Sequence, residues 1–311
     1  MNKMKVAIIG AGISGLSLAK NLSKSGHEVC VFEKRREIGK MACSGLFSDR
    51  LLSFIPESNK LIENEIKSVF IHFPKKTVNV LFSKRFLVMD HAKLDRLMAD
   101  MAEKEGVKIE LEKEVNDIPK GFDRIIGCDG SNSVIRRKLG LSNPSQRLGV
   151  MGFVKEDDNS DFVETWPIKK GFIWKIPRGK ELEYGAIGEI DEVKGVFEEF
   201  LKKRNIVLER MESALVPQGF IIPNNKKVTL CGDAAGLCKP WSGGGVVWGL
   251  IAASYLLKYF PDFVKYRNSL KKFFLIRIFI SKVATWIVYF LGFKLPWFLP
   301  KKIKMESDFL F

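Results

Sequence analysis

The chain begins with short apolar runs that alternate with a segment of helical spacing. Lys5–Ile9 predicts a strand, Leu16–Leu22 carries apolar residues at the spacing of a helix, and Val29–Phe32 predicts a second strand. The turn between the first strand and the helix has the sequence G-A-G-I-S-G, from Gly10 to Gly15. This order of elements predicts a βαβ unit with a glycine-rich first turn.

The spacing of the glycines gives each a separate task. In such units the first glycine, here Gly10, makes the tight turn, Gly12 lets the backbone approach a pyrophosphate, and Gly15 lets helix and strand pack closely. Glu33 follows Gly15 by 18 residues, close to the usual offset of an acid that binds ribose hydroxyls. A glycine turn also occurs without a nucleotide, but strand, helix and acid in register favour nucleotide binding. Because a carboxylate repels a 2′-phosphate, NADP is disfavoured at this site.

A second glycine-rich stretch, from Cys231 to Leu250, also joins a strand to a helix. An apolar strand, Val228–Cys231, ends in Gly-Asp, and a loop then leads to three glycines, Gly243–Gly245, that open an apolar helix. Such a loop offers free backbone N–H groups and the positive end of a helix dipole to an electron-rich group. The two glycine-rich stretches together predict that FAD lies between them.

Two further segments are candidates for the cofactor site. Glu37–Ser48 follows the second strand and contains Cys43, which would lie near the reactive ring if this loop runs beside it. The alternative is that Cys43 is a small apolar filler. Phe122–Cys128 predicts another strand, which leads into Asp129-Gly130 at a sheet edge over the cofactor or into a simple turn.

The rest of the chain predicts a second, β-rich domain. Ile66–Phe73 and Thr77–Met89 contain alternating apolar residues, and residues 147–190 predict a set of strands that are rich in Trp, Phe and Gly and separated by turn signals. We therefore expect one antiparallel sheet that walls an apolar pocket. Helices are predicted at His91–Glu105 and Asp191–Arg204, and a strand at Val107–Val115. We therefore predict an α/β fold with a Rossmann-like FAD-binding domain interleaved with an antiparallel sheet domain for the substrate, followed by a helical tail. The predicted domains are 1–65, 90–145 and 225–270 for FAD, 66–89 and 146–224 for the sheet, and 271–311 for the tail.

Composition narrows the cellular setting. The 311 residues are 46% hydrophobic, which is enough for a large core. The five cysteines are scattered without a C-x-x-C pair, which argues against disulfides or a zinc site and fits a reducing cytoplasm. Val6–Ile9 is too short for a signal peptide. The net charge of +15 alone allows nucleic acid, anionic lipid or an acidic substrate as partner.

The tail favours the lipid. From Lys271 onward, eight basic residues stand against Glu306 and Asp308, among many large apolar residues. As a helix, Phe273–Phe293 places Arg277, Ser281, Thr285 and Tyr289 along one side. Its longest uncharged run is eleven residues, short of the roughly 20 that span a bilayer. We expect an interfacial helix on the cytoplasmic face of an anionic membrane, with a packing helix or dimer contact as the alternative, and no nucleic acid.

Three motifs resemble those of the geranylgeranyl reductase family: C-S-G at residues 43–45, F-I-W-K-I-P-R at 172–178 followed by G-A-I-G at 185–188, and G-D-A-A-G-L-C-K-P-W-S-G-G-G-V at 232–246. Members are FAD enzymes with the fold of aromatic hydroxylases, and they saturate isoprenoid chains of archaeal ether lipids or chlorophyll precursors. The resemblance covers residues 1 to about 250. His91 stands where relatives usually have Arg, and Ile176 and Arg178 replace Phe and Lys.

The resemblance implies a set of site residues. Trp174 and Pro177 would line the lipid pocket, and we place Trp241 with them. Asp233 would bond a ribityl or ribose hydroxyl. Together with the glycine turn, His91 and Asp129, the residues expected on FAD are Ser14, Glu33, Cys43, Gly45, Val115, Asp233, Gly245 and Val246.

The implied chemistry is hydride transfer from the flavin to an alkene. An isolated alkene needs a proton at its other carbon, and Cys43 is the candidate donor, or a residue that holds the ring. Since no second dinucleotide turn is visible, electrons would come from NAD(P)H or a ferredoxin-like carrier. The alternatives are a flavin-dependent monooxygenase or halogenase, because F-x-W-x-I-P is similar to a halogenase motif, and a flavoprotein that only relays electrons.

Overall fold

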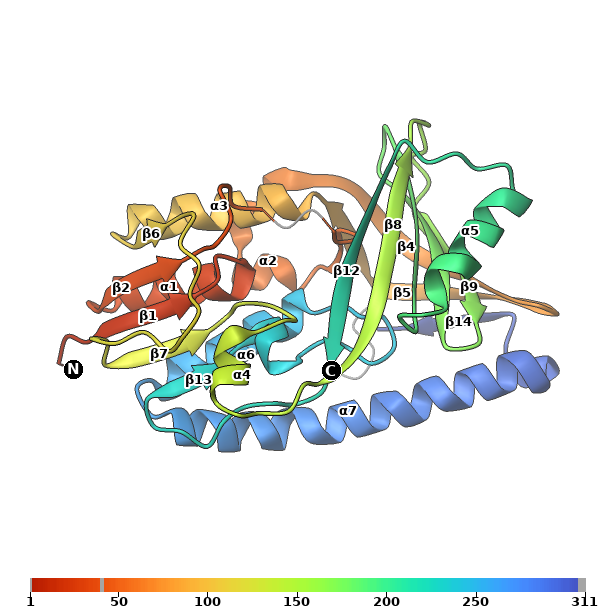
Figure 1. Ribbon diagram of the computed structural model, residues 1–311. Helices are drawn as coiled ribbons and strands as arrows, with labels where there is room; N and C mark the ends of the chain where they lie inside the picture. The colour runs from red at the N-terminus through yellow and green to blue at the C-terminus, as the bar shows by residue number, and fades with distance from the viewer. Residues whose placement is uncertain (1, 40–41, 307–311) are drawn as a thin grey trace. The chain divides into compact units, whose positions relative to one another are not determined.

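The structure, a computed structural model, describes residues 2–39 and 42–306 (Figure 1). These residues form two compact units, each built from separated pieces of the chain. Of the described residues, the first unit takes in 2–39, 91–145 and 216–278, and the second takes in 42–90, 146–215 and 279–306.

The first unit is built on a parallel sheet whose strands follow the order β13-β7-β1-β2-β6. Neighbouring strands pair in parallel throughout, with β1 between β2 and β7. The predicted Rossmann-like core is therefore present. The strands are β1 (Lys5–Ile9), β2 (Glu28–Phe32), β6 (Lys108–Glu110), β7 (Arg124–Gly127) and β13 (Val228–Leu230).

Helices of the first unit connect and cover these strands, and α1 contacts both α3 and α6. The first half of α7 also belongs here, because Phe274 is fully buried and its ring lies 4.8 Å from that of Trp248. The helices are α1 (Ile13–Lys24), α3 (His91–Lys104), α4 (Val134–Lys138), the 3-10 turn η2 (Gly232–Ala235), α6 (Val246–Tyr259) and α7 (Phe263–Lys294).

The second unit contains a larger sheet with the strand order β12-β8-β11-β10-β9-β4-β5-β14, and β3 pairs with β5. Helix α5 packs on it through Phe197 and Val193, which are buried against Val150 and Ile173. The strands are β3 (Leu46–Ser48), β4 (Ile62–Phe73), β5 (Lys76–Met89), β8 (Ser145–Val154), β9 (Phe162–Ile168), β10 (Gly171–Pro177), β11 (Leu182–Gly188), β12 (Arg210–Gln218) and β14 (Lys302–Met305). The helical segments are α2 (Leu51–Phe54), η1 (Pro56–Leu61), α5 (Val193–Lys203) and η3 (Pro296–Phe298).

The sheet differs from the expected antiparallel one. Strand β4 pairs in parallel with β9, and β5 pairs in parallel with β14, so the sheet is mixed. The run Lys302–Met305, which forms β14, carries no strand pattern that stands out from the basic tail. In the first unit, the predicted strand Val107–Val115 ends already at Glu110, because Glu112 and Lys113 turn back to bond the carbonyls of Arg35 and Glu33.

The units also divide the chain differently from the predicted domains. Residues 42–65 were expected with the glycine turn, but they lie in the second unit because β3 pairs with β5 and β4 starts at Ile62. Residues 271–278, expected in a separate tail, continue α7 within the first unit.

Helix α7 turns its polar residues inward in the second unit. Ser281 is buried, Thr285 donates to the Ser281 carbonyl, and the Tyr289 hydroxyl donates to the Gly171 carbonyl of β10 at 2.6 Å. Gly292 lies against the ring of Phe73, where a Cβ atom would come within 2.0 Å of Phe73 Cε1. The opposite side of the helix is apolar and exposed. Within the part of the chain that the structure describes, α7 is the one helix long and apolar enough to cross a membrane, judged by length and composition.

Candidate active site

The glycine turn has the geometry that the sequence predicts. Gly10 has a φ of +103°, and a Cβ there would lie 2.3 Å from the Cys128 carbonyl oxygen. A Cβ on Gly15 would lie 2.2 Å from the Gly10 oxygen and 3.3 Å from Ile8. Both positions therefore require glycine for the fold itself.

Gly12 is different, because a Cβ built there meets no atom within 4 Å. It is also the N-cap of α1, and among the described residues no side chain caps it. The first N–H groups of α1 therefore have no capping side chain, and an anion is favoured at such a helix start. This cradle fits the pyrophosphate of FAD.

The acid at the end of β2 lies beside this turn. Glu33 Oε2 accepts from the Ala11 amide at 2.8 Å, and Oε1 accepts from the Arg35 amide at 3.0 Å. Each carboxylate oxygen keeps a further lone pair for a ribose hydroxyl. Val115 lies in the loop after β6, whose residue Lys113 donates to the Glu33 carbonyl.

Asp129 also lies at the glycine turn, with its Cα 3.0 Å from where a Gly10 Cβ would stand. Its Oδ2 accepts from the Val134 and Ile135 amides at 2.6 and 3.2 Å and so caps α4. Its Oδ1 is buried and has no hydrogen-bond partner among the described residues. A ligand hydroxyl fits this acceptor, so Asp129 has both a structural task and a place for FAD.

The second glycine-rich stretch meets the first through Ser14. A Cβ on Gly232 would lie 2.8 Å from Ser14 Oγ, and a Cβ on Gly249 would lie 2.4 Å from it. Fully buried Arg136 adds a second tie, since Nη1 donates to the Ala234 carbonyl at 2.8 Å. The structure thus brings residues 10–15, 129–136 and 232–249 together.

The loop before α6 brings Asp233, Cys238 and Gly245 together at the start of the helix. Gly245 is the N-cap of α6, and a Cβ there would lie 2.8 Å from both Asp233 Oδ1 and Cys238 Sγ. Val246 is the first residue of the helix. Lys239, only 7% exposed, lies with Nζ 5.4 Å from the ring centroid of Trp241. The Lys239 backbone amide donates to the Gly244 carbonyl at 3.1 Å, and the Cys238 thiol donates to Asp233 Oδ1 at 3.4 Å, so these contacts fix the loop at the start of α6.

Two of the residues predicted for the site, His91 and Trp241, contact other side chains of the first unit. His91, 6% exposed, has Nε2 3.5 Å from Asp95 Oδ1 within α3, so its ring points along its own helix. Trp241 lies in the first unit, with its ring centroid 6.5 Å from that of Trp248. Their predicted roles at FAD and at the substrate stay predictions.

The remaining predicted residues belong to the second unit. Cys43 is half-buried in the loop before β3, and Gly45 has a φ of +61° with its carbonyl bonded by the Met89 amide at 2.9 Å. Trp174 is 8% exposed and lies across Gly185 of β11, where a Cβ would come within 2.2 Å of the indole. The Pro177 carbonyl accepts from Asn64 Nδ2 at 3.1 Å.

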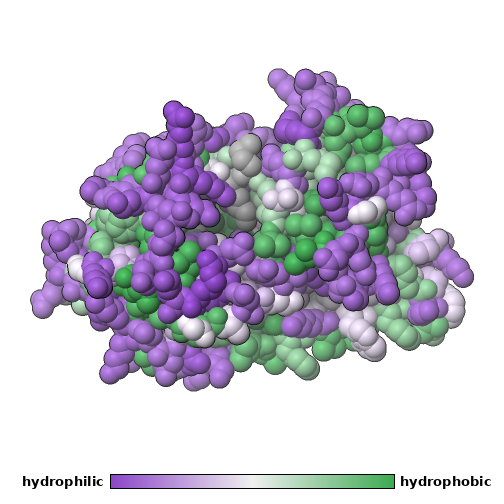
Figure 2. Space-filling view, viewed as in Figure 1, coloured by the Kyte–Doolittle hydropathy of each residue, from purple (hydrophilic) through white to green (hydrophobic). Residues whose placement is uncertain are grey.

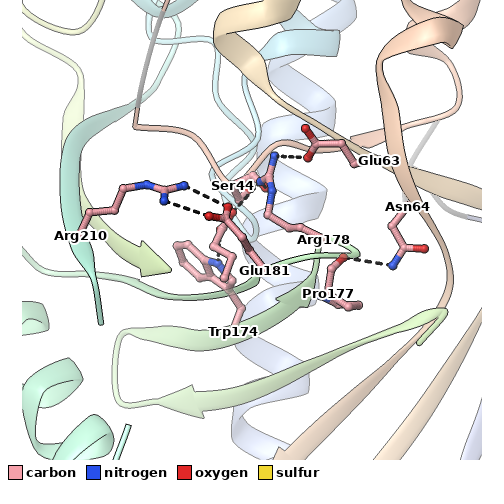
Figure 3. A network of polar contacts seen from close by, with 9 residues as sticks. Ser44, Glu63, Asn64, Trp174, Pro177, Arg178, Glu181 and Arg210 are labelled. Carbon is pink, nitrogen blue, oxygen red and sulfur yellow. Dashed lines mark hydrogen bonds and ion pairs between the residues drawn. The ribbon is translucent and has the colours of Figure 1, made fainter. Parts of the chain in front are cut away.

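Sequence reasoning missed a buried ionic network in this unit (Figure 3). Glu183, fully buried on β11, accepts from Trp174 Nε1 at 2.7 Å and from Arg178 Nη1 at 2.8 Å. Burial raises the pKa of Glu183 to about 8, although the charge of Arg178 and the hydrogen bonds from Trp174 and Arg178 oppose the rise. The sequence offered one signal of this network, which is the single charged residue between Leu182 and Tyr184 in a strand that is otherwise largely apolar.

The comparisons with known proteins agree with this arrangement. Residues 8–49 match the family model of the NAD(P)-binding Rossmann-like domain. The chain also shares its fold with flavin enzymes, including the flavin-dependent halogenase CmlS, with 19% identity, a TM-score of 0.68, and coverage of 83% of this chain and 58% of that one. The chain therefore has the fold of FAD-dependent oxidoreductases, as predicted.

More particular relatives come from the reductases. Digeranylgeranylglycerophospholipid reductase 1 of Methanosphaera stadtmanae is 26% identical over 81% of this chain and 73% of that protein. A geranylgeranyl bacteriochlorophyll reductase-like protein from Thermoplasma acidophilum has a TM-score of 0.80 at 21% identity, covering 92% of this chain and 87% of that one. These comparisons confirm the predicted fold class and the resemblance to the geranylgeranyl reductase family.

Substitutions at Gly12 and Gly15 should separate ligand binding from packing. Gly15→Ala places a methyl group against backbone, so we expect the free energy of unfolding of the apoprotein to fall by about 1–3 kcal/mol. Gly12→Ala meets open space, so the apoprotein should stay within about 0.5 kcal/mol of wild type, while the dissociation constant for FAD rises at least about tenfold. Urea denaturation and flavin fluorescence titration measure the two quantities. Equal FAD affinity in Gly12→Ala would remove Gly12 from the cofactor site.

Glu183 should make stability depend on pH. Its pKa is raised in the folded protein to about 8 from 4.5, so unfolding releases a proton between these values and the free energy of unfolding falls as pH rises. The slope is at most about 1.4 kcal/mol per pH unit. In Glu183→Gln this component disappears, and the stability of the variant relative to wild type should rise from about pH 5 to about pH 8. Parallel profiles from urea denaturation would contradict the assignment.

Proposed function

We propose that the chain is a peripheral membrane reductase that saturates C=C bonds in geranylgeranyl chains, in membrane ether lipids or in a prenyl diphosphate. The observation that carries the proposal is the similarity to digeranylgeranylglycerophospholipid reductase, which extends over 81% of this chain. The glycine turn and residues 231–250 together form the candidate FAD site. The C-S-G loop at residues 43–45 also resembles the corresponding motif of these reductases.

The chain's own residues have distinct tasks in this reaction. FAD, when bound and reduced, supplies the hydride. The N–H groups of α1 beyond Gly12 hold the pyrophosphate, and Glu33 holds a ribose. The start of α6 favours negative charge at the ring. Cys43 supplies the proton to the second alkene carbon and regains it from solvent.

Electrons reach the flavin from NAD(P)H or from a ferredoxin-like carrier in this proposal. The halogenase fold similarity keeps a monooxygenase or halogenase as the second candidate. NAD(P)H oxidation measured with and without oxygen separates the two, because an oxygenase requires O₂ and an alkene reductase is only short-circuited by it.

The exposed apolar side of α7 supports the proposal that the protein binds a membrane surface. We define the α7 apolar face as Ile276, Phe279, Val283, Trp286, Ile287 and Phe290, which are 40–66% exposed. The rings of Trp286 and Phe290 stack with centroids 5.7 Å apart. Figure 2 shows hydrophobic surface between polar residues along the lower edge, where α7 runs in Figure 1. Contiguous exposed apolar surface of this kind marks an interaction site.

The charges beside this face favour an anionic lipid surface over a second protein. Trp297 and Phe298, 66% and 67% exposed, follow α7 closely in the chain, and exposed Lys301, Lys302 and Lys304 come after them. Aromatic residues next to lysines are typical of a membrane interface. The helix lies on the bilayer in this proposal, because a spanning orientation would pull Ser281 and Tyr289 away from their contacts in the second unit.

Lipid analysis tests the function directly. A host that makes unsaturated geranylgeranyl ether lipids should, on expressing this chain, accumulate saturated chains that differ by two hydrogens per reduced bond in mass spectra. Unchanged unsaturation in cells whose purified protein carries flavin would rule the proposal out.

Cys43→Ala tests the proton donor. Since a positioned general acid contributes about 10²–10⁴ in rate, we expect kcat for lipid reduction to fall at least about 100-fold with the FAD content unchanged. Cys30→Ala, which removes another half-buried thiol, is the control and should retain activity. Full activity of Cys43→Ala would exclude the thiol from the chemistry.

Replacing Phe279 and Trp286 by Ser tests the membrane contact. Because burying each side chain contributes about 1.5–3 kcal/mol, binding to vesicles that contain anionic lipid should weaken at least about tenfold in a sedimentation assay. Val207→Ser is the matched control, because Val207 is 81% exposed and lies outside the α7 apolar face. Equal binding of all three proteins would contradict the membrane assignment.

A further inference from the structure

The guanidinium of Arg178 holds the backbone of the C-S-G loop. Nη1 donates to the Ser44 carbonyl at 3.0 Å and to Glu183 Oε2 at 2.8 Å, and Nη2 donates to Glu63 Oε2 at 2.9 Å. Figure 3 shows Arg178 between Ser44 and Glu63. Arg178 follows β10 directly, whereas Ser44 precedes β3, so the contact joins parts of the second unit that are far apart in sequence.

The loop is closed tightly onto this guanidinium. A Cβ on Gly45 would lie 2.9 Å from Arg178 Nη1, 3.0 Å from Nη2 and 2.2 Å from the Met89 carbonyl oxygen. The positive φ of Gly45 and the hydrogen bond from the Met89 amide to its carbonyl fix the other side. Cys43, adjacent to Ser44, therefore sits on a backbone that is held from two directions.

Glu183 holds the guanidinium in turn. Its carboxyl group is fully buried, and the Trp174 indole orients its second oxygen at 2.7 Å. The Phe153 ring covers Arg178 at 5.8 Å. Burying two ionisable groups is costly, and apolar residues of similar volume are often as stable. A buried pair that also holds one specific loop is consistent with a role in positioning that loop.

We propose that Arg178 and Glu183 are positioning residues that fix the Cys43 loop, so that the thiol is presented in one orientation for proton donation. This inference rests on the proposed function for its chemical meaning. Its geometric content, that loss of the pair releases Cys43, stands apart from any lipid activity. In this chain a Lys at position 178 would present one ammonium in place of the planar guanidinium that reaches two carboxylates and the Ser44 carbonyl together.

The experiment compares two matched double variants. Arg178→Met with Glu183→Gln removes the pair without leaving a buried charge alone. Arg210→Met with Glu181→Gln removes the neighbouring pair, which is bidentate at 3.0 and 3.1 Å and makes no hydrogen bond to residues 43–45 in the described part of the chain. The readout is the alkylation rate of Cys43 in the flavin-loaded protein, by peptide mass spectrometry, divided by the rate of Cys30 on β2.

Removing the Arg178 pair should raise this ratio at least about tenfold, because hydrogen bonds to charged groups hold the loop against local opening. The control double variant should keep the wild-type ratio. A wild-type ratio in the folded Arg178→Met/Glu183→Gln protein would overturn the proposal. If circular dichroism shows that this protein does not fold, Arg178→Lys decides in its place, with a raised ratio supporting the proposal and a wild-type ratio overturning it.

Lipid reduction gives the second readout. Loss of positioning should lower kcat of the Arg178 pair variant while KM for lipid stays near the wild-type value, and the control pair should change neither. Absence of lipid activity in the wild-type protein would refute the proposed function, yet the alkylation ratio would still test the positioning of Cys43. The two failures are therefore distinguishable.

Discussion

The first unit depends on how closely its backbone segments approach one another. Gly10 and Gly15 let α1 come down on the end of β1, and Ser14 fills the space that side chains on Gly232 and Gly249 would take. Any larger residue at these positions would separate the two glycine-rich stretches. Of the three glycines in the turn, Gly12 is the one with room for a side chain, so the same turn combines obligatory packing with space for a ligand. The binding of an anionic cofactor follows from that combination.

The second unit is organised around buried polarity. Arg178 donates to the buried carboxyl group of Glu183 under the loop that carries Cys43, and Tyr289 of α7 donates to the carbonyl of Gly171, the first residue of β10. Ser281, Thr285 and Tyr289 of α7 make their contacts inside the unit, so the apolar side of the helix is exposed to solvent. The fold thus produces both an ordered thiol and an apolar surface from residues whose partners are distant in sequence.

What could be predicted from sequence was mainly local. The tasks of Gly10 and Gly15, the acid at Glu33 and the helix after Gly245 depend on spacing within one βαβ or strand-helix unit, so residue order was sufficient. The Arg178–Glu183 pair was missed because it depends on the pairing of β10 with β11 and on a loop more than a hundred residues away. The polar stripe of α7 was predicted from periodicity, but periodicity does not say which side faces protein. Strand β14 was missed because pairing with β5, rather than an apolar pattern, stabilises it.

In the proposed function, electrons pass from a reduced flavin to an alkene without oxygen. Flavin-loaded protein, reduced chemically under anaerobic conditions, should regain the absorbance of oxidised flavin when lipid with geranylgeranyl chains is added, in proportion to the double bonds saturated. Flavin that stays reduced until air is admitted would contradict the account and favour an oxygenase.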